Sequence, residues 1–178
     1  MHPYEDGDKW YALFVLTGQE EKVRERLKYR FKDTKLEFIV PKRKLIERKA
    51  GKWEEKVSTL FPGYILVNGY IGTEEYYALA GVPGLLRILK DAYGPLEIPE
   101  QDAEVIKKLI GYGDIIEQSN ILIESGKVIV VDGPLLGLEG LIQSVNKRKG
   151  RAKVRLTFAS ESRLVDLSIF ILQPAKES

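Results

Sequence analysis

The residues of this 178-residue chain that could do chemistry are basic, and their densest acid-free cluster lies in its C-terminal third. Six of the nine residues from 147 to 155 are Lys or Arg, and none is an acid. Such a cluster can neutralise several phosphates, and a protruding basic hairpin can enter an RNA groove or cup a loop. A solvated hairpin tip is the alternative, but an acid-free cluster exceeds what solubility requires. We therefore predict RNA contact by Lys147, Arg148, Lys149, Arg151, Lys153 and Arg155.

A second basic set, nearer the N-terminus, could extend this footprint. Its positive charge is diluted by glutamates at positions 47, 54 and 55. The first two of its residues are included in the predicted RNA contact. The set comprises Lys42, Arg43, Lys44, Arg48 and Lys49.

The net charge of +2 conceals a segregation of charge along the chain. Residues 1–56 carry 15 Lys and Arg against 11 Asp and Glu, residues 57–118 carry 4 against 9, and residues 119–178 carry 9 against 6. Two positive segments thus flank an acidic middle. This pattern favours binding to a polyanion and says nothing about the fold.

Residues for catalysis or metal binding do not converge in this sequence. There is no cysteine, and the single histidine is His2, which excludes disulfides, thiolate nucleophiles and Cys/His zinc sites. Carboxylate pairs such as Glu20-Glu21 are adjacent and therefore diverge. Ser125 and Ser144 lack a histidine base, and no phosphate-binding Gly-rich loop appears. We predict a protein that is not an enzyme and has no cofactor and no metal.

Membrane and export signals are also missing from the pattern. No apolar run approaches the roughly 18 residues that a spanning helix needs, and the first residues carry charges. The sequence predicts a cytoplasmic protein without membrane contact. Nothing in it suggests more than a monomer.

Short strands surround the basic cluster. Residues 128–131 form an apolar strand that ends in the turn Asp132-Gly133-Pro134, and residues 141–145 lead into the basic turn. Residues 153–158 alternate between basic and apolar side chains, which places Lys153 and Arg155 on one solvated face. These strands predict a small β-barrel over residues 122–178.

The N-terminal part predicts a sheet with helices packed on it. Strands are expected at 10–16, 36–40, 57–60 and 65–67, and a charged strand pair turns at 49–52. Helices are expected from residue 20, at 74–80 and at 100–110, the first with the apolar stripe Val23, Leu27 and Phe31. The basic row on its opposite face reads as solvated surface. Residues 113–121 read as a linker, so the fold class is α+β: an antiparallel sheet flanked by helices over 1–112, then the barrel.

Two sets of motifs resemble one known family. Residues 127–155, KVIVVDGPLLGLEGLIQSVNKRKGRAKVR, are similar to the KOW motif. Residues 9–27, KWYALFVLTGQEEKVRERL, together with LFPGYILV at 60–67 and VPGL at 82–85, look like the NGN domain of the NusG family of transcription elongation factors. The order of the motifs also matches. The resemblance implies an SH3-like form for the barrel.

This resemblance implies a partner for the N-terminal domain. Family members seat this domain on RNA polymerase through an apolar patch, which suppresses pausing. By motif alignment the patch falls on Phe14, Phe61, Tyr64 and Leu66. Rigid aromatic rings beside a Pro-Gly turn suit a binding hot spot. Phe61 and Tyr64 are expected at the surface, whereas Phe14 and Leu66 lie on strands and could point inward.

The resemblance also implies partners for the barrel. Family barrels bind a ribosomal small-subunit protein or the termination factor Rho, and the matching residues are Leu135, Leu138 and Phe158. The usual Phe-Gly-Arg-x-Thr loop is replaced by FASESR at 158–163, which alters backbone freedom and charge at that surface.

The acid-free basic turn is a second departure, because family members typically have an acid or a proline there. With both departures the chain resembles a specialised paralogue of the LoaP type, which recognises an RNA hairpin in a leader transcript and acts in transcription antitermination. RfaH-like members instead read a DNA hairpin. The β-branched alternation of the barrel favours a stable barrel over a refolding helical form. The alternative is a free-standing KOW-type RNA-binding or ribosome-associated protein that does not act on polymerase.

Overall fold

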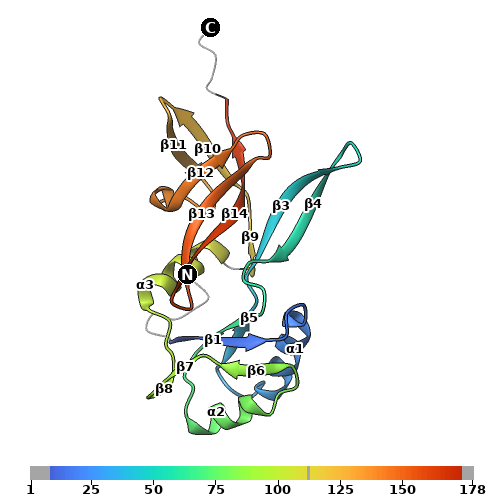
Figure 1. Ribbon diagram of the computed structural model, residues 1–178, viewed down its shortest axis with the longest axis vertical. Coiled ribbons are helices and arrows are strands. Elements are labelled where there is room, and N and C mark those ends of the chain that lie inside the picture. The colour runs from blue at the N-terminus through green and yellow to red at the C-terminus, as the bar shows by residue number, and fades with distance from the viewer. Residues whose placement is uncertain (1–8, 112, 174–178) are drawn as a thin grey trace. The chain divides into compact units, whose positions relative to one another are not determined.

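The computed structural model describes residues 9–111 and 113–173 of the chain. It separates into two compact units (Figure 1). The N-terminal unit comprises Met1–Pro41 and Thr59–Ile106, and the C-terminal unit comprises Lys42–Ser58 and Lys107–Ser178. The predicted α+β class is confirmed, with a helix-flanked sheet in the first unit and a curled, barrel-like sheet in the second.

The N-terminal unit is a four-stranded antiparallel sheet with strand order β2-β5-β1-β6. Two helices, α1 and α2, pack on one face of it, and a two-stranded ribbon, β7 and β8, follows the sheet. Helix α3 then leads out of this unit into the C-terminal one. The bounds are β1 (Trp10–Val15), α1 (Glu20–Arg30), β2 (Glu37–Ile39), β5 (Tyr64–Asn68), α2 (Thr73–Ala80), β6 (Leu85–Ile88), β7 (Lys90–Asp91), β8 (Gly94–Pro95) and α3 (Glu100–Ile110).

Period-two alternation in the strands decides which residues face these helices. Leu13 of β1 and Ile65 of β5 are fully buried and join one core cluster with Val23 and Leu27 of α1 and Leu79 of α2. The apolar stripe predicted for the first helix is therefore confirmed. The intervening strand residues fall on the other face of the sheet, because successive side chains of a strand point in opposite directions.

The C-terminal unit contains a five-stranded sheet with strand order β11-β10-β14-β13-β12. Its longest strand, β14, pairs antiparallel with β13 and parallel with β10, so one strand bridges the two halves of the curled sheet. The strands predicted around the basic turn are confirmed. The bounds are β10 (Ser119–Glu124), β11 (Lys127–Asp132), η1 (Glu139–Leu141), β12 (Ile142–Asn146), β13 (Arg151–Phe158) and β14 (Glu161–Ile171).

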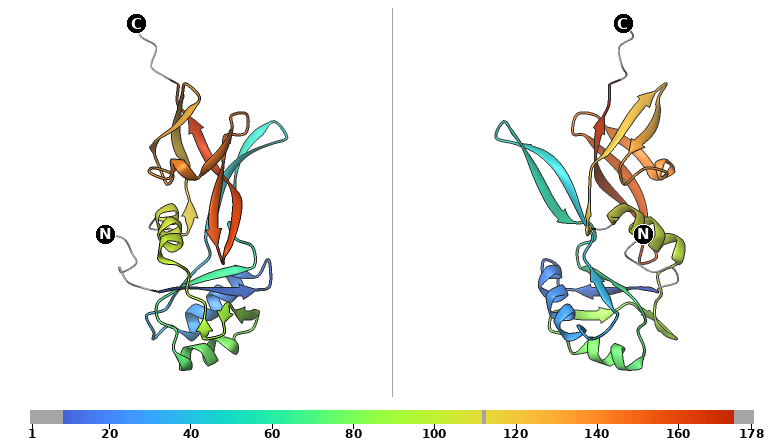
Figure 2. Two further views of the ribbon diagram at one scale, coloured as in Figure 1. Left: turned by 60° about the vertical axis from the view of Figure 1, so that its left-hand side comes forward. Right: turned by 180° about the vertical axis from the view of Figure 1, so that it is seen from behind.

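A charged hairpin completes the C-terminal unit. It consists of β3 (Lys42–Lys49) and β4 (Lys52–Thr59), and its turn has positive φ angles of 51° at Ala50 and 78° at Gly51. Figures 1 and 2 show the hairpin as an arm whose strand β3 runs beside β14. Although the hairpin lies within the predicted domain 1–112, its contacts group it with the barrel strands.

The segment read as a linker, 113–121, contains regular structure. Strand β9 (Ile115–Ile116) pairs in parallel with β3, and β10 begins at Ser119. The backbone N–H of Lys42 also donates to the carbonyl of Asp114 at 2.7 Å. Strand pairing satisfies backbone groups that a solvated linker would leave to water.

Candidate nucleic-acid interface

The basic turn is a short, well-tied connection between β12 and β13. Asn146 and Arg151 are directly opposed, and the side-chain oxygen of Asn146 accepts a hydrogen bond from the backbone N–H of Lys149 at 3.0 Å. Gly150 has a φ of +65°, in the region that favours glycine, and its carbonyl accepts from the N–H of Ile169 at 3.0 Å. The backbone is thus fixed from within, and the side chains at 147–149 are exposed.

Strand β13 presents further cations on its outer face. Lys153 and Arg155 are exposed, whereas the intervening Ala152, Val154 and Leu156 are buried. The predicted solvated face is therefore confirmed. The guanidinium of Arg155 donates to the hydroxyl of Ser162 at 2.9 Å, which holds it along the strand without neutralising it.

Not every predicted contact residue is available to a ligand. Arg151 forms an ion pair with Glu47 at 3.2 Å, lies 4.0 Å from a carboxylate oxygen of Asp166, and has only 18% of its side chain exposed. Both carboxylates are more than a third exposed, so water partly screens these ion pairs, which occupy the guanidinium without being buried. The predicted role of Arg151 in RNA contact stays a prediction, and its geometry is that of a tie between β13 and the hairpin.

The second basic set is likewise engaged in the structure. Arg43 donates to the backbone carbonyl of Asp166 at 2.9 Å, and burial lowers the pKa of its guanidinium against the opposing effect of Asp166. The guanidinium nevertheless stays protonated, as arginine does throughout proteins. Lys44 lies 3.0 Å from Glu117, whose hydrogen bond and charge raise the pKa of the lysine. Lys42 is half-buried in β3. Contacts within the C-terminal unit therefore engage Arg43 and Lys44, and of the interleaved glutamates only Glu55, 4.0 Å from Lys44, takes part.

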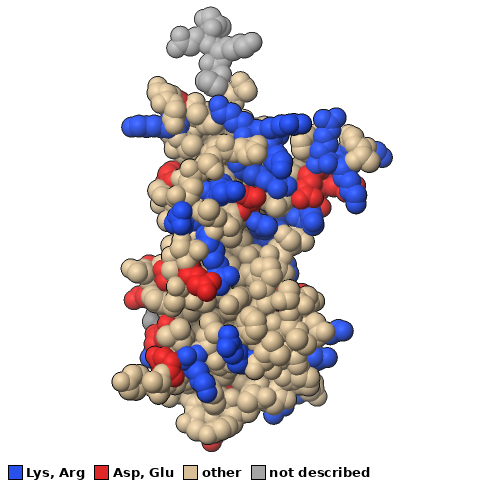
Figure 3. Space-filling view, viewed as in Figure 1, with Lys and Arg blue, Asp and Glu red and all other residues tan. Residues whose placement is uncertain are grey.

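The cations that remain available to a ligand are those of the turn and of the outer face of β13. Within residues 9–111 and 113–173, no carboxylate lies within ion-pair distance of Lys147, Arg148, Lys149 or Lys153. In the space-filling view, Lys and Arg gather over the barrel strands and the hairpin, with a few acids between them (Figure 3). Positive charge without partners is what a phosphate backbone requires.

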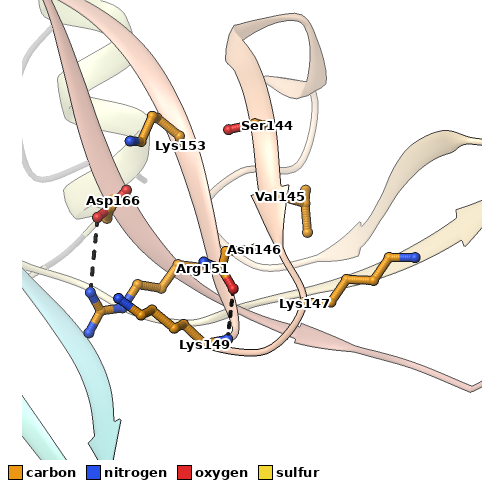
Figure 4. Close-up of a pocket in the computed structure, with 8 residues that line it drawn as sticks. All are labelled: Ser144, Val145, Asn146, Lys147, Lys149, Arg151, Lys153 and Asp166. Carbon is orange, nitrogen blue, oxygen red and sulfur yellow. Dashed lines mark hydrogen bonds and ion pairs between the residues drawn. The ribbon is translucent and has the colours of Figure 1, made fainter.

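A groove of about 500 Å³ runs beside this turn. Figure 4 shows Lys149 and Arg151 extending to one side of the strands, toward Asp166, while Lys147 extends to the other. Lys153 borders the same groove from β13. The turn therefore offers cations in more than one direction, which suits a curved strand of phosphates better than a single small anion.

The four residues of the predicted polymerase patch differ in their exposure. Phe14 and Tyr64 are opposed across β1 and β5 and form an edge-to-face ring pair with centroids 5.4 Å apart, both half-buried. Arg87 of β6 lies over the Phe14 ring at 5.2 Å. Leu66 is also buried, at 1% exposed, although its place between Ile65 and Val67 puts it on the sheet face opposite the helices.

The surface position expected for Phe61 is wrong, because its side chain is only 2% exposed. The chain turns between Phe61 and Gly63, with the N–H of Tyr64 donating to the carbonyl of Phe61 at 3.1 Å. A large ring at the base of such a turn gains more from burial than from solvation. The binding role assigned to Phe61 and Leu66 stays a prediction.

Glu20 holds this turn in place. Its buried carboxylate accepts hydrogen bonds from the N–H groups of Gly63 at 2.8 Å and Gly18 at 3.1 Å. Burial alone raises the pKa of Glu20, but the backbone N–H groups outweigh it and the net pKa is lowered. Gly63 has a φ of +87°, and a Cβ there would lie 3.2 Å from the hydroxyl of Thr17. No pattern in the sequence indicated this role of Glu20.

The barrel residues matched to partner contacts are mostly inside. Leu135 is 1% exposed and Phe158 is 0% exposed, whereas Leu138 is half-buried. Phe158 continues the inward series of β13, so alternation decides its direction. The surface position implied for Leu135 and Phe158 is therefore not observed, and their partner contact stays a prediction.

Comparisons with known proteins agree with this architecture. A family described as "Transcription termination factor nusG" matches residues 8–107. This chain belongs to the NusG family. It is 28% identical over 173 residues to the transcription termination/antitermination protein NusG of Thermus thermophilus, covering 89% of this chain and 94% of that one. The same protein of Vibrio cholerae is 25% identical, with 89% and 91% covered.

A solved structure shares the fold. The structure titled "Domain interaction in Thermotoga maritima NusG" aligns with a TM-score of 0.55 and 21% identity, covering 90% of this chain and 93% of that one. NusG-family proteins are non-enzymatic regulators of transcription termination and antitermination, so the expectation of a protein without catalytic activity is confirmed. Among the described residues, no acid or histidine group is arranged to hold a metal ion, and no helix is long and apolar enough to cross a membrane.

Sequence reasoning missed two further surface residues. Arg87 is on β6, opposite Phe14, and only the strand register shows that it joins the aromatic pair. Trp53 is 61% exposed on the hairpin. Its signal was present in the sequence, where Trp53 is the single aromatic residue of the strongly charged segment 42–56.

Proposed function

We propose that this NusG-family protein is an elongation and antitermination factor of the LoaP type, which binds RNA polymerase through its N-terminal unit and an RNA hairpin through its basic turn. The observation that carries the RNA contact is the set of unpartnered cations, Lys147, Arg148, Lys149 and Lys153. Solvation of a hairpin tip does not require three consecutive cations on a backbone that is itself held rigid.

The polymerase contact is proposed from the family and from the aromatic pair. Phe14 and Tyr64 present rigid rings on the sheet face opposite the helices, with a guanidinium over one of them. Aromatic and arginine side chains dominate binding hot spots. This support applies to Phe14 and Tyr64 more than to Phe61 and Leu66, which are buried.

The proposal assigns one role to each predicted domain. Residues 1–112 would act as the polymerase-binding domain and 122–178 as the KOW barrel, with 113–121 between them. Coupling to Rho or to a ribosomal small-subunit protein would need Leu138, the one half-exposed member of the matched set, or neighbouring surface. We therefore place RNA ahead of these two partners.

The test is selection of RNA by the purified full-length protein from a pool of random hairpins. The enriched hairpin is then titrated with wild type and with a Lys147→Ala/Arg148→Ala/Lys149→Ala variant. Enrichment of one hairpin, with affinity lost in the variant, would support the proposal. Equal weak binding by both proteins would mean that the basic turn is solvated surface without a role in RNA binding. Sedimentation with ribosomes together with indifference to polymerase would favour the free-standing alternative.

A further inference from the structure

Trp53 occupies an unusual position for its residue type. It lies on β4 with 61% of its surface exposed, between Lys52 and the acidic pair Glu54 and Glu55. The guanidinium of Arg48 stands 5.9 Å from its ring centre, so the ring is partly ordered by a cation on one face. A partner that covered this indole would gain the free energy of burying it.

A second exposed aromatic ring lies near Trp53. Phe170 of β14 is 54% exposed, and both rings line one groove of about 360 Å³ within the C-terminal unit. Ile46 of β3 contributes to the same wall. Grooves of this volume are at the lower end of those that hold small ligands, which fits one nucleotide better than a folded partner.

The same groove is bordered by the basic turn. Lys147, Arg148 and Lys149 all line it, and no acidic side chain does. The groove therefore combines two stacking surfaces with three cations. Proteins that bind single-stranded nucleic acid use this combination, with bases on aromatic rings and phosphates on lysine and arginine. An apolar peptide would gain nothing from the three cations.

We propose that this groove receives an unpaired base of RNA, stacked on Trp53 and Phe170, while the adjoining phosphates contact Lys147, Arg148 and Lys149. This inference rests on the proposed RNA contact of the basic turn and adds a specificity for unpaired residues. It also assigns a role to the hairpin β3–β4, since the hairpin supplies Trp53 to a site otherwise built by the barrel. A stem alone would then bind more weakly than a stem with a loop or bulge.

The test compares two RNA probes of equal length on the full-length protein. One is a fluorescein-labelled single-stranded 12-mer of mixed sequence, and the other is a blunt 12-base-pair duplex with the same label. Loss of a base-stacking ring weakens binding roughly 5- to 140-fold. We expect Trp53→Ala and Phe170→Ala to weaken binding of the single strand at least about fivefold and to change duplex binding less than about twofold. Trp53→Phe should retain most of the affinity.

Tyr93→Ala is the matched control, because Tyr93 is 98% exposed and lies in the other unit. Unchanged single-strand binding by Trp53→Ala and Phe170→Ala would overturn the inference. If the Lys147→Ala/Arg148→Ala/Lys149→Ala variant still loses affinity in that case, the proposed function survives and only the stacking fails. If that variant also binds both probes like wild type, the RNA contact of the turn fails as well.

Tryptophan fluorescence gives a second readout that does not depend on affinity. The chain has two tryptophans, and Trp10 is 4% exposed. Saturating single-stranded RNA should quench the emission of wild type and leave that of Trp53→Phe, which retains only Trp10, unchanged. Equal emission changes in both proteins at saturation would contradict stacking on Trp53.

Discussion

Removing the three consecutive cations of the basic turn should change the salt dependence of RNA binding as well as the affinity. The perturbation is the Lys147→Ala/Arg148→Ala/Lys149→Ala variant. These side chains are exposed, and the turn is held by the side chain of Asn146 and by Gly150, neither of which is altered. The fold should therefore survive the substitution, and any loss of binding reports on charge.

The magnitude follows from counterion release. Each phosphate neutralised contributes about 0.7 to 0.9 to the slope of log affinity against log salt, so three contacts contribute about 2 to 2.7. Between 50 and 200 mM salt, the wild-type affinity should fall about 20- to 40-fold more than that of the variant. Arg151 is left in place because its ion pair with Glu47 would confound a larger substitution.

The assay is a fluorescence anisotropy titration of the selected hairpin at four salt concentrations. A matched control removes three lysines from the other unit, as Lys22→Ala/Lys28→Ala/Lys35→Ala, so that net charge changes equally. The control should keep the wild-type slope. Parallel salt plots for wild type and the turn variant, whatever their offsets, would refute the assignment of these cations to phosphates.

Three further results are expected. Phe14→Ala/Tyr64→Ala should weaken binding to core RNA polymerase by about tenfold or more, since truncating a hot-spot ring costs about 2 kcal/mol or more; wild-type capture of polymerase by a variant of unchanged circular dichroism would contradict it. The double substitution Ala159→Asn/Ser160→Gly in the turn between β13 and β14 should stabilise the protein by about 1 kcal/mol, because both residues have positive φ angles, 52° and 63°. Thermal unfolding is the measurement, and an unchanged or lower unfolding midpoint would mean that the turn is not strained. Glu20→Gln should lower the free energy of unfolding by about 1 to 3 kcal/mol at pH 7. Because the folded pKa of this carboxyl is lowered, its stabilising contribution is present above the unfolded pKa and is lost as pH falls through the folded pKa. The stability difference between wild type and variant should therefore shrink in urea unfolding at acid pH, and a constant difference would contradict the assignment.

Much of the fold could be predicted because its signals are local. The helix at 100–110 has the predicted bounds, and Ala103 and Ile106 are buried as its spacing indicated. The alternation of β13 fixed the outward direction of Lys153 and Arg155. Periodicity determines which face of an element is apolar, and it needs no knowledge of the neighbouring elements.

The remaining features depend on contacts between residues far apart in the sequence. Neither Glu47 nor Asp166 could be assigned to Arg151 from spacing, since they come from different elements of the C-terminal unit. Phe61 was expected outside because turns are usually exposed, but burial of its ring outweighs that tendency. The groove that joins Trp53 to the basic turn likewise forms only when the hairpin lies beside the barrel strands.

The central claim is that an RNA sequence in the transcript directs this protein to the polymerase that made it. The most direct test is transcription in vitro across a terminator, on templates that encode either the selected hairpin or a scrambled stem upstream. The account predicts increased readthrough with full-length protein on the hairpin template alone, abolished by Lys147→Ala/Arg148→Ala/Lys149→Ala. Equal readthrough on both templates, unaffected by that variant, would contradict it.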